Sequence, residues 1–132
     1  MITIAECYLT LGEYILEEDM FKAYGYFEEA ARFGSGKAAM KLANYHEKQE
    51  NYDKAYEALV WAFEAHDEEF AEAAYRLGIH HEYGLGMQDK EIDRAYIFYS
   101  HAADKGHKKA KKKMQYENVK KLKSVLKEMF QA

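Results

Sequence analysis

The sequence of 132 residues contains no proline, a single cysteine and no long uninterrupted run of apolar residues. Because proline breaks the interior of a helix, its absence permits long, unbroken helices. The lone Cys7 cannot form a disulfide within the chain, which suits a reducing compartment, so we expect a cytoplasmic protein. No stretch approaches the roughly 20 apolar residues that a membrane span requires, and the N-terminal residues lack the basic region of a secretory signal. We therefore expect no membrane protein.

The composition is that of a globular domain with an uneven charge. Hydrophobic residues make up 48% and charged residues 32% of the chain, which argues against disorder and predicts a single domain that can bury a core. The net charge of −4 hides an asymmetry between two segments. Residues 1–106 contain 10 Lys and Arg against 21 Asp and Glu, whereas residues 107–132 contain 9 Lys against 2 Glu. The sequence thus predicts an acidic body with a basic C-terminal helix.

Three segments repeat one pattern of small and large residues. Small residues at fixed helical positions let two helices approach closely, and larger residues fill the space beside them. One such helix pair cannot bury its apolar face alone, so repeated pairs are expected to stack. The recurring positions are Leu11-Gly12, Leu42-Ala43 and Leu77-Gly78, then Ala23-Tyr24, Ala55-Tyr56 and Ala95-Tyr96, then Ala30, Ala62 and Ala102, with Phe27, Leu59 and Tyr99 as the large residues.

The pattern predicts an all-α chain that forms one helical-repeat domain over residues 1–132. We expect three helix pairs, at about 4–34, 37–66 and 72–106, followed by a C-terminal helix over 107–131. Capping residues such as Asp19, Asn51 and Asp67 mark helix starts, and glycines mark helix ends. The expected helices cover residues 3–17, 20–33, 37–49, 52–65, 69–83, 91–104 and 107–130.

The third repeat carries a longer motif, made of Leu77-Gly78, Tyr83-Gly84-Leu85-Gly86, Asp89, Ala95, Tyr99, Ala102-Ala103 and Gly106. With these residues it resembles the Sel-one-like repeat family, a relative of the tetratricopeptide repeats. The first repeat is intermediate and the second is closer to a plain tetratricopeptide repeat. The resemblance implies a right-handed α-α superhelix of three helix-pair repeats plus a C-terminal capping helix. It also implies a protein that acts as an adaptor, chaperone or scaffold for other proteins.

The same resemblance implies that the first helix of each pair lines a concave groove. A groove of apolar side chains flanked by carboxylates suits a protein segment. Asn44 could also clamp a backbone amide of the partner. The alternative is that these residues are ordinary exposed surface, or that the C-terminal segment covers them. The predicted partner-binding residues are Leu9, Glu13, Leu16, Met40, Asn44, Glu47, Tyr75, Ile79, Glu82 and Tyr83.

The C-terminal segment predicts an amphipathic helix with Val119, Leu122, Leu126 and Met129 on one face and lysines elsewhere. Such a helix can cap the apolar end of the third pair, as a solenoid requires. It can also form a homodimer seam, or bind an acidic partner, because the spacing is that of a coiled coil. Nucleic-acid binding is disfavoured, since the lysines lack arginines and interleaved aromatic residues.

Residues that suggest chemistry have structural explanations. His80 and His81 resemble metal ligands, but adjacent helical residues point about 100° apart, so they cannot easily share one ion. Cys7 is expected in the core. Gly84-Leu85-Gly86 follows no predicted strand and is no dinucleotide loop. No convergent nucleophile, base and oxyanion donor can be identified, so we expect no enzyme, cofactor or metal site.

The sequence therefore favours a protein–protein interaction module, either an adaptor or scaffold or a chaperone, that binds a peptide, a helix or a folded domain. The alternative is an immunity protein or a secretion chaperone that neutralises a cognate toxin or effector. An acidic body suits a basic partner in that case, because complementary charge speeds association.

Overall fold

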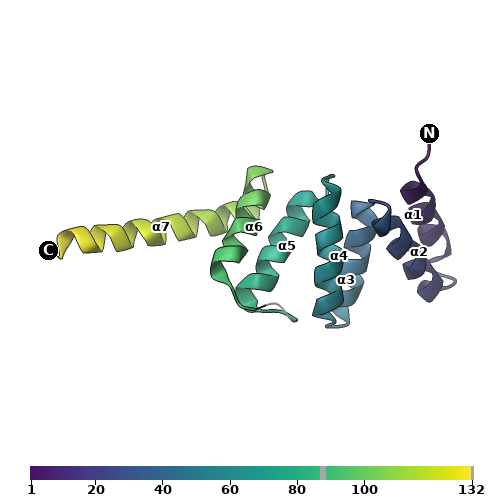
Figure 1. Cartoon of the computed structure of the whole chain (residues 1–132), viewed down its shortest axis with the longest axis horizontal. Coiled ribbons are helices and arrows are strands. Elements are labelled where there is room, and N and C mark those ends of the chain that lie inside the picture. Colours follow the sequence, from purple (N-terminus) through teal and green to yellow (C-terminus); the bar gives the residue numbers. More distant parts are fainter. Residues whose placement is uncertain (87–88, 132) are drawn as a thin grey trace.

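Helices form nearly all of the computed structural model, which describes residues 1–86 and 89–131 (Figure 1). No strand occurs in this described part. The helix bounds differ from the expected ranges by no more than two residues. The helices are α1 (Ile4–Ile15), α2 (Met20–Arg32), α3 (Gly36–Lys48), α4 (Tyr52–Ala65), α5 (Phe70–Tyr83), α6 (Ile92–Asp104) and α7 (Lys108–Phe130).

The helices stack as successive pairs along the long axis of the molecule. Figure 1 shows α1 with α2, α3 with α4 and α5 with α6 side by side, while α7 points away from the last pair. The all-α fold and its three helix pairs are confirmed. The right-handed sense of the superhelix stays a prediction.

Side chains at the helix starts explain most of the boundaries. Asp19 accepts a hydrogen bond from the Lys22 amide, and Asn51 accepts one from the Lys54 amide, as predicted. Asp67 departs from its predicted role as a cap of α5. It accepts hydrogen bonds from the Glu69 amide (3.0 Å) and from the Gly36 amide (3.1 Å). Asp67 thus ties the turn after α4 to the start of α3, because Gly36 has no side chain to block the carboxylate.

The seam inside each pair depends on a residue with little or no side chain. A Cβ at Gly12 would lie 2.5 Å from Phe27 Cε1, and a Cβ at Gly78 would lie 2.6 Å from Tyr99 Cδ1. Both rings are fully buried. The equivalent position in the second pair is Ala43, where the large residue is the smaller Leu59. In every pair, therefore, the smaller the residue on the first helix, the larger the residue of the second helix that packs against it.

The first turns of α7 attach to α5 and α6 through one carboxylate. The Tyr99 hydroxyl donates to Glu82 Oε1 (2.5 Å), and Lys113 Nζ donates to both Glu82 oxygens at 2.8 and 3.1 Å. Burial raises the pKa of Glu82, but the hydrogen bonds from Lys113 and Tyr99 outweigh burial and hold that pKa below its usual value. Ala110 is buried in the same contact. These residues fix where α7 begins.

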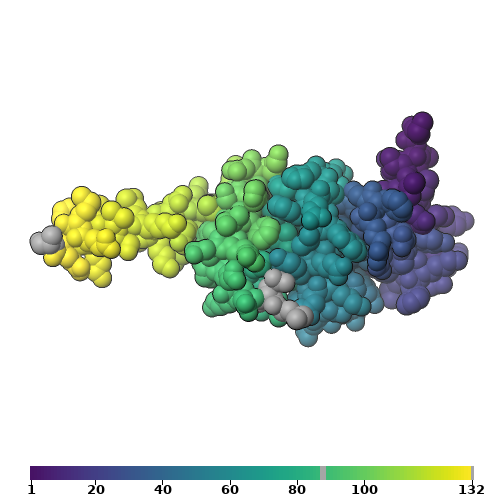
Figure 2. All heavy atoms as spheres, viewed as in Figure 1, coloured from purple at the N-terminus to yellow at the C-terminus, as the bar shows by residue number. Residues whose placement is uncertain are grey.

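The later turns of α7 do not lie on the third pair, so only its first turns can act as the expected cap, and that role stays a prediction. Beyond its first turns the helix extends from the body as a narrow arm (Figure 2). Its apolar residues from Val119 to Phe130 are exposed. The axis of α7 leaves the surface of α6, so no helix of the described chain lies beneath the later turns.

The close approach at Gly78 predicts a destabilised variant, Gly78→Ala. The added methyl group would press on the ring of Tyr99, which cannot withdraw without losing its hydrogen bond to Glu82. Overpacking costs about 1–3 kcal/mol, which exceeds the gain of about 1 kcal/mol in helix propensity. We expect a lower free energy of unfolding in urea titrations followed by circular dichroism.

Gly25→Ala is the matched control, because Gly25 also lies inside a helix but a Cβ there would meet nothing within 4 Å. This variant should be more stable than the parent by about 0.5–1 kcal/mol. Equal effects of the two substitutions would contradict the packing role of Gly78.

The Glu82 contact predicts a pH-dependent loss of stability in Glu82→Gln. Because the pKa of Glu82 is lowered by folding, its ionised form stabilises the fold above the unfolded pKa of about 4.3. This stabilisation is lost as the pH falls through the folded pKa. Glu82→Gln should therefore lower the free energy of unfolding by about 1–3 kcal/mol at pH 7 and by less at pH 3. Urea titrations at both pH values measure the difference.

Glu13→Gln provides the control, because the Glu13 carboxylate is exposed and lies 3.5 Å from Lys37 Nζ. Exposed pairs of this kind contribute little, so its stability should stay close to that of the parent at both pH values. A loss in Glu82→Gln that is the same at pH 3 and pH 7 would argue against the ionised contact.

Candidate functional site

The predicted partner-binding residues lie on the first helices of the three pairs, on α1, α3 and α5, with Leu16 at the end of α1. The structure does not leave them all accessible. Met40, expected as an apolar anchor, is only 7% exposed and belongs to the core. Leu9 and Leu16 are half-buried against the same core, and Ile79 is half-buried against the core of the last pair. Glu13, Asn44 and Tyr83 are exposed.

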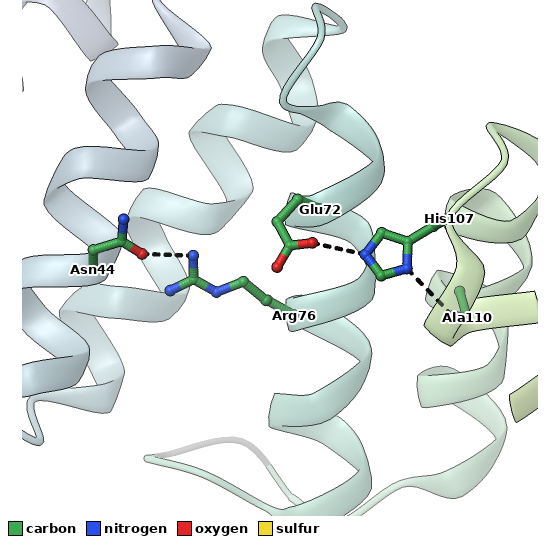
Figure 3. Close-up of polar contacts among 5 residues, drawn as sticks. All are labelled: Asn44, Glu72, Arg76, His107 and Ala110. Atoms are coloured by element: carbon green, nitrogen blue, oxygen red, sulfur yellow. Dashed lines mark hydrogen bonds and ion pairs between the residues drawn. The ribbon is translucent and has the colours of Figure 1, made fainter. Parts of the chain in front are cut away.

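Polar contacts between neighbouring repeats occupy much of this first-helix face. Arg76 Nη1 donates to Asn44 Oδ1 (2.7 Å), as Figure 3 shows, and Arg76 Nη2 lies 2.5 Å from Glu47 Oε2. The Arg76 side chain is only 15% exposed. Burial raises the pKa of Glu47, but its contacts with His80 and Arg76 outweigh burial and lower that pKa. The acceptor of Asn44 that could clamp a partner is therefore already used within the chain.

The start of α7 covers the same face at the third pair. His107 Nε2 lies 2.7 Å from Glu72 Oε2 (Figure 3). The His107 ring also stacks on Tyr75, with centroids 4.5 Å apart. Lys113 holds Glu82 as described above. The alternative in which the C-terminal segment covers the predicted groove thus applies to Tyr75 and Glu82. Whether the remaining exposed residues bind a partner stays a prediction.

A different surface is hollowed, and we name it the α2–α4 groove. It begins as a depression of about 390 Å³, continues through one of about 160 Å³, and reaches a third of about 350 Å³ at Trp61. The first two share Glu28, Leu42, His46 and Lys54, and the second and third share Trp61. The groove therefore runs along the second helices α2 and α4, with residues of α3 in its floor.

The α2–α4 groove combines apolar and charged side chains. Phe21 is 93% exposed at one end, beside Tyr24, whose ring lies 4.5 Å from that of Tyr45. Burial, and then the charge of Lys54, lower the pKa of His46, which favours the neutral form of its ring. Open surfaces with aromatic anchors and a charged rim are typical of protein–protein contacts, whereas small molecules bind in enclosed pockets.

Sequence reasoning missed this groove because it looked for binding residues on the first helices. Phe21 carried a weak signal, as a large apolar residue outside the small-and-large pattern of α2. Its exposure could not be read from periodicity, because the gap between α2 and α4 depends on how the first two pairs stack. Cys7 was also placed wrongly, since it is exposed in the first turn of α1 rather than buried.

The two adjacent histidines serve packing. His81 Nε2 lies 2.8 Å from the Tyr56 hydroxyl, and its ring stacks on Phe98 with centroids 5.6 Å apart. His80 Nε2 lies 3.5 Å from Glu47 Oε1. Within residues 1–86 and 89–131, no three or more His, Cys, Asp or Glu residues are grouped so that they could hold a metal ion. Among the described helices, none has the length and apolar character needed to cross a membrane.

Comparisons with known proteins agree with the helix pairs. Residues 4–35 and 71–107, more than half of the chain, match the model of the Sel1 repeat. The second pair lies outside the matched residues. No curated protein matches the chain.

A solved structure has the same fold. The chain is similar to the crystal structure of a Sel1 repeat protein from Oxalobacter formigenes, with a TM-score of 0.66 and 23% sequence identity. The similarity covers 80% of this chain and 44% of that protein, so the chain spans less than half the length of this relative. With the matched residues above, these findings place the chain in the Sel1 repeat family, whose repeats generally mediate protein–protein interactions.

Proposed function

We propose that this protein is an adaptor, scaffold or chaperone that binds a segment of another protein in the α2–α4 groove. The function is the one expected from the sequence, and the docking surface moves from the first helices to the second helices. The burial of Met40 supports this move, as do the contacts that Arg76 and α7 make with Asn44, Glu47 and Glu82.

The observation that carries the proposal is Phe21, a large side chain that is almost completely exposed at the mouth of a depression. Burying such a side chain against a partner contributes roughly 2–3 kcal/mol. Trp61 lies farther along the same groove, with the Arg32 guanidinium 5.8 Å from its ring centroid. Aromatic and arginine side chains dominate the energetics of protein interfaces. The groove therefore suits a segment that presents apolar side chains at two separated points.

The alternative function, an immunity protein or a secretion chaperone, is the same binding act directed at one dedicated partner. The acidic character of residues 1–106 favours it. A basic toxin or effector would be drawn to this body electrostatically, which raises the association rate at low salt. A location in the cytoplasm and a role without catalysis belong to both versions of the proposal. The single cysteine supports the cytoplasmic location, since a lone thiol suits a reducing compartment.

Site-specific crosslinking tests the docking surface. We expect that a photoreactive phenylalanine in place of Phe21 will crosslink a discrete protein in the native cells, because a bound segment would lie against this side chain. Mass spectrometry identifies the captured protein. With that partner purified, Phe21→Ala should weaken binding about tenfold, as the loss of an interface anchor does.

Two further positions serve as controls for the crosslink. Tyr83 reports on the first-helix face, and Tyr14 is an exposed residue of α1 that belongs to neither surface. The proposal predicts a strong product from Phe21 and little from Tyr14. Efficient crosslinking from Tyr83 without crosslinking from Phe21 would contradict the proposal and would place the docking surface on the first helices.

A further inference from the structure

The start of α7 repeats the first helix of a pair. Ser35 accepts a hydrogen bond from the Ala38 amide (3.1 Å), and His107 accepts one from the Ala110 amide (3.3 Å). Ala38 and Ala110 are both completely buried. Each cap follows a glycine, and the spacing from the glycine to the buried alanine is the same. By this local geometry α7 is the first helix of a fourth pair.

The second helix of that fourth pair is not present in the described chain. In the complete pairs, the small residue of the first helix lies against a large residue of the second, as Gly12 does against Phe27 and Gly78 against Tyr99. In α3, the small residue Ala43 lies eight residues after the cap Ser35, and the residue eight positions after the cap His107 in α7 is Gln115, which is exposed. The direction in which Gln115 points is therefore the direction from which a second helix would pack.

An apolar stripe continues from Gln115 along this same side of α7. Steps of 4, 3, 4 and 3 residues keep side chains on one face of a helix with 3.6 residues per turn. We call these residues the α7 stripe, and their exposed fractions lie between 42% and 67%. The α7 stripe consists of Val119, Leu122, Leu126 and Met129.

The α7 stripe does not face α6. Ala110 and Met114 pack on the last pair, and Glu117 and Lys121 line a shallow depression beside Tyr96. At 100° per residue these body-facing positions lie on a different side of α7 from Leu122 and Leu126. The stripe is thus a second, separate face of the helix, exposed along its length.

The positive charge of α7 favours an acidic partner for this face. Residues 107–132 carry 9 Lys, and their only carboxylates, Glu117 and Glu128, lie on the side of the helix away from the stripe. Lys123 borders the stripe on one side, and Lys120 and Lys127 lie farther round the helix on that same side. A second copy of α7 would bring like charges together, which disfavours its pairing here. A helix with carboxylates beside its apolar face would instead pair with the lysines.

We propose that the α7 stripe binds an acidic amphipathic helix of another protein, which completes the fourth helix pair. Gln115 stands where the inner pairs have Gly or Ala, so the bound helix packs at a larger distance than in those pairs. The spacing of the stripe is that of a coiled-coil seam, so the partner helix carries apolar residues in the same heptad pattern. This interaction does not depend on the α2–α4 groove.

A designed peptide tests the proposal on the full chain. The probe is a helix of about 21 residues, three heptads, with Leu at the a and d positions and Glu at most of the others. The matched control peptide replaces every Glu by Lys. Fluorescence anisotropy should show binding of the Glu peptide only. Leu122→Asn and Leu126→Asn should each weaken that binding about tenfold, and 0.5 M NaCl should weaken it further.

Two control variants separate the stripe from other surfaces. Ile97→Asn removes an exposed apolar residue of α6 and should leave the affinity unchanged. Phe21→Ala, which tests the groove, should also leave it unchanged, so the two proposals fail independently. Circular dichroism checks that α7 keeps its helix in each stripe variant.

Three results would overturn the proposal. The first is equal affinity for the Glu and Lys peptides, or none for either. The second is a dimer in sedimentation equilibrium that Leu126→Asn dissociates, because a second copy would then occupy the stripe. The third is binding to vesicles of anionic phosphatidylserine without binding to the Glu peptide, which would assign the helix to a membrane surface.

Discussion

Contact between a ring and a bare stretch of helix backbone sets the geometry of this molecule. Phe27 and Tyr99 lie where a Cβ on Gly12 or Gly78 would stand, and both rings are fully buried. Such a contact draws the two helices of a pair close together and fixes their rotation, because the ring fits at one position along the helix only. Each pair is then a rigid unit with one apolar face left over, and stacking the pairs buries that face.

Stacking in turn decides which surfaces remain for a partner. Neighbouring first helices meet through polar contacts, with Arg76 reaching α3 and Glu82 reaching α7. These contacts satisfy half-buried charges that would otherwise be costly, and they leave little apolar surface between the first helices. The surface along the second helices α2 and α4 is hollowed at the groove, where Phe21 is exposed. The same stacking therefore uses one face internally and leaves the other hollowed.

The fold could be predicted because its determinants are local. The positions of Gly12, Ala43 and Gly78 recur with a period that only helix pairs explain, and Asp19 and Asn51 mark helix starts by themselves. The exposure of the candidate binding residues could not be predicted, because it depends on contacts between residues about 30 positions apart. Met40 is buried in the core that the packed pairs share, and Arg76 reaches Asn44 in the neighbouring repeat. Asp67 was read as a cap for the same reason, since its partner Gly36 lies in an earlier repeat.

α7 is much longer than any helix of the complete pairs. The helices of the complete pairs have 12 to 14 residues, whereas α7 has 23. An inner first helix ends where the chain must turn back to place its second helix, and α7 has no such turn. Its apolar residues nevertheless keep the helical period as far as Met129, beyond the length of any inner helix. Periodic apolar residues on an exposed helix lower solubility unless something covers them. A partner helix longer than α2, α4 or α6 would cover the full stripe.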